Sequence, residues 1–304
     1  MRDDHALQPI PFYKMHGLGN DFVIIDIRGQ SVDPVTPALA RVIGDRNRGV
    51  GFDQLTVVRD SSDRDVAADI DFWNPDGSMA AACGNATRCV ADLLMKEQQV
   101  DRLTLRSENG LLPTERLESG MIRANMGRPK LDWRDIPLKE ASHTERIDVK
   151  LGPIDDPVLW GPGAVNMGNP HAVFFVDDAD KAEVEKLGPF IENHPMFPER
   201  TNVEFAHVID PNQIRLRVWE RGAGVTLACG SGACATVVAG ARRNLVERRA
   251  VVHLDGGPLA IEWSEADDCV YMAGPTQMVF AGALSPEFLE TVSRDKETAD
   301  AASS

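Results

Sequence analysis

The chain has 304 residues, of which 43% are hydrophobic and 26% are charged, and its formal net charge at pH 7 is -15. This length and apolar content are sufficient for two domains that each bury a core. The acidic balance argues against a nucleic-acid-binding protein or one that binds anionic membrane surfaces, because no basic stripe is available to neutralise phosphates.

The sequence gives no sign of secretion or membrane insertion. The N-terminal residues lack an apolar segment of the kind that a secretory signal needs, and no apolar run approaches about 18 residues. The chain contains 5 cysteines, an odd number that does not resemble a disulfide framework. We therefore expect a cytoplasmic protein whose thiols are reduced.

The first half of the chain is expected to be rich in strands. Short β-rich runs broken by Gly, Asn, Asp and Pro predict strands at 22–26, 55–58, 70–73, 103–106, 113–115 and 121–125. Apolar residues at helical spacing predict helices at 37–43 and 86–98.

The second half shows the same mixture. Strands are expected at 172–176, 203–209 and 214–219, and helices at 180–186 and 232–243. The fold class that follows is α+β.

A segment that follows a strand in the first half occurs again in the second half. At one constant spacing, the repeat pairs Trp73 with Trp219, Asn74 with Glu220, Cys83 with Cys229, Gly84 with Gly230, and Asn85 with Ser231. Such a duplication predicts two similar domains related by a pseudo-twofold axis, each bringing one cysteine to the cleft between them. Turn-rich residues 127–130 and the later Gly274-Pro275 suggest domains of residues 1–129, joined by 276–304, and 130–275.

Cys83 and Cys229 are the main candidates for chemistry. Each is followed by Gly and a small polar residue just ahead of an expected helix, so the thiol lies at the positive end of the helix dipole. A free thiol with a pKa of about 8.5 is only about 3% ionised at pH 7, and a helix N-terminus lowers that pKa. Two such thiols that share one proton form a thiol and a thiolate, which suits inversion of a stereocentre.

Other interpretations of the cysteines and glycines are weaker. Cys89, Cys234 and Cys269 are typical of small core residues. The spacing from Cys83 to Cys89, and from Cys229 to Cys234, differs from that of a zinc knuckle, and no His cluster accompanies either pair. The Gly-rich segment 17–20 precedes a strand and not a helix, so it is a poor dinucleotide fingerprint. We expect no metal and no NAD.

Eight sequence blocks together resemble the diaminopimelate epimerase family. They are FYKMHGLGNDF (12–22), GFDQL (51–55), NPDGS (74–78), CGNATR (83–88), GNPH (168–171), TNVEF (201–205), ERGAG (220–224) and ACGSGAC (228–234). The resemblance implies two α+β domains, each a curved mixed β-sheet wrapped around a central helix, with the active site in the cleft between them. It also implies an isomerase that converts LL- to meso-2,6-diaminopimelate in lysine and peptidoglycan biosynthesis, works without pyridoxal phosphate or any other cofactor, and forms a homodimer.

The resemblance also assigns roles to residues. Cys83 resembles the proton donor and Cys229 the proton acceptor for the LL substrate, while His171 and Glu220 match residues that tune the thiols. Positions that match substrate contacts are Asn20, Gln54, Asn74, Gly84, Asn85, Asn169, Asn202, Glu220, Arg221, Gly230 and Ser231. This set suits a substrate with two carboxylates and two ammonium groups, since the Arg fork and backbone N–H groups bind carboxylates and amide oxygens accept from ammonium groups.

Three rival functions stay open. A racemase of another amino acid, such as histidine or proline, would keep both cysteines but lose contacts for a second carboxylate, and the presence of Asn169, Asn202 and Arg221 counts against it. A non-catalytic binding module could also arise by duplication. A thiol redox enzyme is disfavoured because the sequence contains no C-x-x-C motif.

Overall fold

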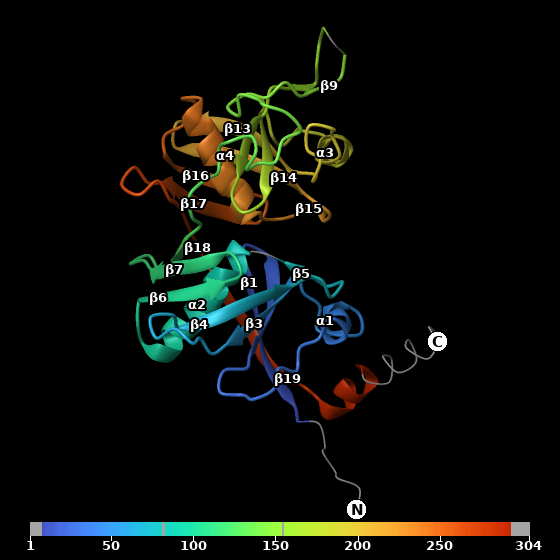
Figure 1. Ribbon diagram of the computed structural model, residues 1–304, viewed down its shortest axis with the longest axis vertical. Coiled ribbons are helices and arrows are strands. Elements are labelled where there is room, and N and C mark those ends of the chain that lie inside the picture. Colours follow the sequence, from blue (N-terminus) through green and yellow to red (C-terminus); the bar gives the residue numbers. More distant parts are fainter. Residues whose placement is uncertain (1–7, 81–82, 154, 293–304) are drawn as a thin grey trace, which may run out of the picture. The chain divides into compact units, whose positions relative to one another are not determined.

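The computed structural model describes residues 8–80, 83–153 and 155–292 (Figure 1). These residues divide by their contacts into two units. The first contains the chain up to Gly17, Asp21–Pro113 and the chain from Thr276 onward, and the second contains Leu18–Asn20 and Thr114–Pro275. The second unit thus begins before the turn-rich residues 127–130, and the expected domain limits stay a prediction.

The first unit combines a mixed sheet with two helices. Its strands are β1 (Ile10–Gly17), β2 (Asn20–Asp26), β3 (Gln54–Arg59), β4 (Ala68–Trp73), β5 (Met79–Ala80), β6 (Arg102–Ser107), β7 (Gly110–Arg116) and β19 (Gln277–Leu284), and its helices are α1 (Pro37–Gly44) and α2 (Gly84–Gln98). Strand β2 contributes its first residue to the second unit, and β7 runs on into it. The pairs β2–β3 and β4–β6 are parallel, whereas β3–β4, β4–β5 and β1–β19 are antiparallel.

The second unit has more strands and again two helices. Its strands are β8 (Ile122–Asn125), β9 (Lys150–Leu151), β10 (Leu159–Trp160), β11 (Gly163–Asn166), β12 (Pro170–Phe175), β13 (Asn202–Asp210), β14 (Gln213–Glu220), β15 (Gly224–Val225), β16 (Arg249–Leu254), β17 (Gly257–Trp263) and β18 (Val270–Gly274), and its helices are α3 (Val184–Glu192) and α4 (Gly230–Arg242).

The duplication expected from the sequence is present in the topology. The pairs β12–β13 and β14–β16 are parallel, and β13–β14 and β14–β15 are antiparallel. The order β2, α1, β3, β4, β5, α2, β6 in the first unit therefore recurs as β12, α3, β13, β14, β15, α4, β16 in the second, with the same strand directions. Both expectations, an α+β fold and two similar domains, are confirmed.

Helix α4 is the centre of the second unit's core. Its residues from Gly230 to Gly240 are buried except Ser231, and it packs against β11, β12, β13, β16, β17 and β18 (Figure 1). Small residues such as Ala and Gly let the surrounding strands approach the helix on all sides. Helix α2 holds the same place in the order of the first unit, and it packs against β1, β3 and β6.

One expected helix is misplaced. The helix expected at 180–186 is found as α3 at Val184–Glu192, because Val184, Leu187 and Ile191 are the residues that reach the core. Gly188 and Pro189, which commonly end helices, lie inside it. Within the described part of the chain, no helix combines the length and apolarity that crossing a membrane requires.

Gly188→Ala is expected to destabilise the second unit. A Cβ at this position would lie 2.4 Å from Cγ of the partly buried Trp219 side chain and 2.7 Å from its Cβ. Alanine favours a helix by about 0.5–1 kcal/mol, whereas overpacking a core costs about 1–3 kcal/mol, so the net change is a loss. Urea unfolding of this variant and of Lys186→Ala, an exposed position on the same helix, measures the difference. Equal stabilities in the two variants would contradict the close packing of α3 on Trp219.

Candidate active site

Cys83 and Cys229 occupy equivalent positions at the starts of α2 and α4. Each cysteine is the N-cap residue with an extended backbone, and its Sγ accepts a hydrogen bond from the backbone N–H three residues on, at 3.4 Å from Ala86 N and 3.4 Å from Gly232 N. A thiol thus replaces the hydroxyl or carboxylate that usually caps a helix. Each sulfur atom therefore accepts a hydrogen bond from the first turn of a helix, where the backbone N–H groups have no partner within the helix.

The environment of Cys229 opposes ionisation. Burial raises the pKa of its thiol well above the ordinary value, and the nearby Glu220 and Glu204 carboxylates add to the increase. The Ser231 hydroxyl, whose Oγ lies 3.6 Å from Sγ, and the Gly232 N–H act in the opposite direction but are outweighed. The expected net lowering of the thiol pKa is therefore wrong for Cys229, because desolvation is a larger effect than the N–H groups of the helix.

Glu220 ends β14 close to this thiol. Burial raises the pKa of its carboxyl group, while the Thr226 hydroxyl, which donates to Oε1 at 2.5 Å, and the charge of His171 lower it. The raised pKa lets Glu220 hold a proton more readily than a surface carboxyl group. Such a group can exchange protons with a neighbouring thiol.

His171 on β12 is fixed from both sides of its ring. Its Nδ1 lies 2.6 Å from Oε1 of Glu204 on β13, and its Nε2 lies 2.9 Å from Oδ1 of Asn169. The His171 and Glu204 side chains are both fully buried. The two contacts hold the imidazole in one orientation, with Asn169 at one ring nitrogen and a carboxyl group at the other.

Glu204 and Thr226 are absent from the residues expected at the site. Glu204 stands in an otherwise apolar run on β13, and Asn202 lies two residues before it on the same face of the strand. The sequence signal for Glu204 is an acidic residue within an apolar strand, two residues after a polar residue that shares its face. No comparable signal marks Thr226, which acts through Glu220 after the chain turns back in β15.

Two more of the expected residues meet next to β13. Asn202 donates from Nδ2 to Pro170 O at 2.8 Å and accepts at Oδ1 from the Arg221 backbone N–H at 2.9 Å. Arg221 donates from Nη1 to Glu199 O at 3.0 Å and is partly exposed. The second unit thus brings together Asn169, His171, Asn202, Glu220, Arg221, Cys229, Gly230 and Ser231.

The first unit holds a smaller group of amides. Gln54 opens β3 and Asn74 follows β4, and Gln54 Nε2 lies 3.4 Å from Asn74 Oδ1. Asn74 in turn donates from Nδ2 to Ser78 Oγ at 3.0 Å. The Gln54 Oε1 atom is buried and has no hydrogen-bond partner among the described residues. It is an acceptor suited to a donor from a ligand. Gly84 and Asn85 form the first turn of α2, next to Cys83.

Asn20 belongs with the second unit although it opens β2. It follows a tight turn in which Leu18 and Gly19 have positive φ angles of 58° and 81°. Leu18 is buried in the core cluster that also contains Cys229. Its carbonyl oxygen lies against Gly256, where an added Cβ would be only 1.9 Å from this oxygen. The turn that presents Asn20 is therefore anchored by apolar packing on residues of the second unit.

The other cysteines differ in burial, and Cys269, expected in the core, is only partly buried. None of the five cysteines forms a disulfide, and Cys89 and Cys234 are buried as expected of core residues, with burial raising the pKa of Cys89. Among the described residues, no group of three or more His, Cys, Asp or Glu side chains is placed to hold a metal ion.

Structural comparison finds the same fold in several solved structures. A PhzF-family phenazine biosynthesis protein from Bacillus anthracis has a TM-score of 0.64 at 14% identity, covering 91% of this chain and 99% of the other. A hydroxyproline epimerase from Agrobacterium vitis has a TM-score of 0.65 at 13% identity, covering 91% of each chain. At such low identity, these likenesses establish the fold alone.

Sequence comparison is more specific. Residues 12–131 and 163–279 match the family model for diaminopimelate epimerase. A diaminopimelate epimerase from Acidiphilium cryptum (strain JF-5) is 50% identical over 279 residues, covering 92% of this chain and 98% of that protein. Another, from Rhizobium meliloti (strain 1021), is 44% identical, covering 91% of this chain and 92% of that protein. With its two capping cysteines in a duplicated fold, the chain belongs to the diaminopimelate epimerase family.

Proposed function

We propose that this protein converts LL-2,6-diaminopimelate to the meso isomer without a cofactor, using Cys83 and Cys229 as a thiol pair. The observation that carries the proposal is that both cysteines cap helices in the same way at equivalent places in the duplicated fold. Two equivalent acid–base groups suit a reaction whose forward and reverse directions each need one base and one acid.

The chemistry is a proton exchange at one α-carbon. The Cys229 thiolate removes the α-proton of the LL substrate, and the Cys83 thiol delivers a proton to the opposite face of the carbanion. Cys229 therefore ends as a thiol and Cys83 as a thiolate, so the total charge of the two cysteines does not change. Backbone N–H groups of Gly84, Asn85, Gly230 and Ser231 can hold the α-carboxylate and stabilise the negative charge that develops.

The raised pKa of Cys229 is consistent with this role. A thiol of high pKa is a poor acid but becomes a stronger base once ionised. The ammonium group of a bound substrate supplies positive charge that favours the thiolate, and Glu220 is placed to accept the thiol proton. His171, held by Glu204 and Asn169, serves as the second group that adjusts the acid–base balance of the site.

The polar side chains match the remaining groups of the substrate. The unpartnered Gln54 Oε1 and the Asn20, Asn74, Asn169 and Asn202 amides suit the ammonium groups and the chain ends. The Arg221 guanidinium suits the distal carboxylate, which it can bind with two parallel hydrogen bonds. Glu220 combines a substrate contact with its effect on Cys229.

We also propose that the protein is a cytoplasmic homodimer that associates through β19. This strand pairs with β1, and Val279, Ala281 and Ala283 are exposed on it, with Val279 at a register shift between the two strands. Tyr13 and Pro11 lie on β1 directly opposite Ala281 and Ala283. An exposed apolar face of this kind is typical of a self-complementary interface between two copies of a chain.

Isotope placement tests the two-thiol mechanism. In D₂O at early times, deuterium should enter the inverted centre of the meso product and almost none should enter recovered LL substrate, because the abstracting thiolate returns its proton to the original face. Cys83→Ala and Cys229→Ala should each lower turnover by at least about 100-fold, whereas Cys269→Ala should leave it unchanged. Chiral separation with mass spectrometry measures both. Transfer of the substrate's own hydrogen into product, or near-normal turnover in either of the first two variants, would end the proposal.

Glu220→Gln should lower the pKa of Cys229. A carboxylate disfavours a neighbouring thiolate, so its removal leaves Glu204 as the acidic group that raises the pKa, with Ser231 and the Gly232 N–H unchanged. Modification of the Cys229 peptide by methyl methanethiosulfonate, followed by mass spectrometry across pH 6–11, should show a midpoint at lower pH than in the unmodified chain. Glu262→Gln, on β17, is the control. A midpoint that stays in place or rises would show that Glu220 does not act on this thiol.

Val279→Asp should weaken the proposed dimer. A carboxylate in an apolar interface must lose its hydration without gaining a partner, which disfavours association. Sedimentation velocity should detect dimers of the unmodified chain and monomers of the variant at the same concentration. Ile209→Asp changes an equally exposed apolar residue of β13 and should leave the dimer intact. A monomeric unmodified chain would refute this part of the proposal.

A further inference from the structure

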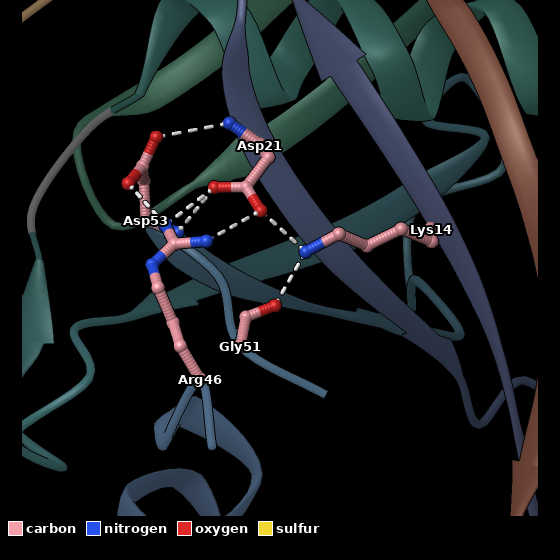
Figure 2. Close-up of polar contacts among 5 residues, drawn as sticks. All are labelled: Lys14, Asp21, Arg46, Gly51 and Asp53. Carbon is pink, nitrogen blue, oxygen red and sulfur yellow. Dashed lines mark hydrogen bonds and ion pairs between the residues drawn. The ribbon is translucent and has the colours of Figure 1, made fainter. Parts of the chain in front are cut away.

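Four charged side chains of the first unit converge beside the start of β2. They are Lys14 on β1, Asp21 on β2, Arg46 after α1, and Asp53 just before β3 (Figure 2). Asp21 Oδ2 accepts from Lys14 Nζ at 2.5 Å, and the same ammonium group donates to the Gly51 carbonyl oxygen. Two positive and two negative groups make the cluster neutral.

Arg46 bridges the two carboxylates. Its Nη1 and Nη2 donate to the two oxygens of Asp21 at 3.1 and 2.8 Å, and Nη2 also donates to Asp53 Oδ1 at 2.7 Å. This is the forked geometry in which Arg–carboxylate pairs are strongest. The Lys14 and Asp21 side chains are only 11% and 18% exposed, so part of the cluster is shielded from solvent.

The two carboxylates also bind each other's backbone. The Asp21 N–H donates to Asp53 Oδ2 at 3.0 Å, and the Asp53 N–H donates to Asp21 O at 2.9 Å and to Oδ1 at 3.1 Å. These bonds close the end of the parallel β2–β3 ladder, whose register begins with Phe22 opposite Gln54. The starts of the two strands are therefore held together by ionic groups as well as by the sheet.

Asp21 keeps its charge over a wide pH range. Although burial raises the pKa of Asp21, hydrogen bonds from Arg46 and Lys14 and their charges outweigh it and lower that pKa to about 2. Asp21 therefore stays ionised throughout the neutral range. Isolated exposed ion pairs contribute little to stability, whereas several charges in one network can hold a strand end in place.

The cluster lies directly beside two residues of the proposed substrate site. Asp21 directly follows Asn20, and Asp53 directly precedes Gln54. We propose that Lys14, Asp21, Arg46 and Asp53 are positioning residues that set the places of Asn20 and Gln54, which contact the substrate in the proposed function. The cluster acts on the substrate only through these two amides.

Arg46→Met tests the proposal. The substitution leaves two carboxylates beside one ammonium group, so the carboxylates repel each other and the ends of β2 and β3 separate. Arg106→Met is the matched control, because Arg106 makes a bidentate pair with Asp69 in the same unit, at 2.9 Å for both bonds, away from Asn20 and Gln54. We expect Arg46→Met to raise the KM for diaminopimelate about tenfold, equivalent to about 1.4 kcal/mol, with a smaller change in kcat. Arg106→Met should change neither.

Hydrogen–deuterium exchange provides a readout that does not depend on the substrate. Exchange at the amides of Asp21 and Asp53, followed in peptides that span 18–23 and 51–56, should become faster in Arg46→Met and stay unchanged in Arg106→Met. A conservative variant completes the set. Asp53→Ala should raise the KM for diaminopimelate, whereas Asp53→Asn keeps an acceptor for the cluster and should hold the KM close to that of the unmodified chain.

The outcomes separate this inference from the proposed function. If the unmodified chain epimerises diaminopimelate but Arg46→Met and Arg106→Met have the same KM, the positioning role is wrong and the function stands. If the unmodified chain does not act on diaminopimelate, the proposed function fails, and exchange alone decides whether the cluster holds the two strand ends. Unchanged exchange in Arg46→Met overturns the inference in either case.

Discussion

A cysteine that caps the N-terminus of a helix is the constraint on which both proposed catalytic thiols depend. The first N–H groups of a helix have no partner within it, so some acceptor must cap them. Here Sγ of Cys83 and Sγ of Cys229 are those acceptors. Because α2 and α4 are packed among strands, the sulfur positions are fixed by the cores of the two units and not by a loop. A thiol placed this way is positioned as accurately as the helix itself.

The same packing sets the acid–base behaviour of Cys229. A helix buried on all sides fixes the thiol, but it also removes water and thereby raises the thiol pKa. The helix N–H groups stabilise a thiolate by less than desolvation costs, and two nearby carboxyl groups increase the difference. The free site is therefore biased toward the neutral thiol. In the proposed mechanism, the ammonium groups of the substrate change this balance, so ionisation of the thiol is coupled to substrate binding.

Local sequence patterns predicted the elements that carry the site. Helices at 37–43 and 86–98 and most strands of both halves were expected where they are found, because their apolar periodicity agrees with their burial. The helix at 184–192 was misplaced because packing on Trp219 overrides Gly188 and Pro189. Strands β1 and β19 were not expected, since their pairing joins residues from opposite ends of the chain, which no local pattern records. The duplication identified both cysteines, but it could not show that burial controls one of them.

The polar residues also fall into those that the sequence predicts and those that only the fold reveals. Residues in short motifs, such as Asn74 and Asn202, were proposed from the sequence, whereas Glu204 and the four-charge cluster make contacts across strands that only the fold reveals. Asn20 depends on both, because it lies in a short motif and is held by contacts across strands. On one side of it, Leu18 is anchored by apolar packing in the second unit, and on the other, Asp21 is anchored by ionic groups in the first. Salt screens the partly exposed ionic anchor and leaves the apolar one intact, so the two anchors of this proposed substrate contact respond to different conditions.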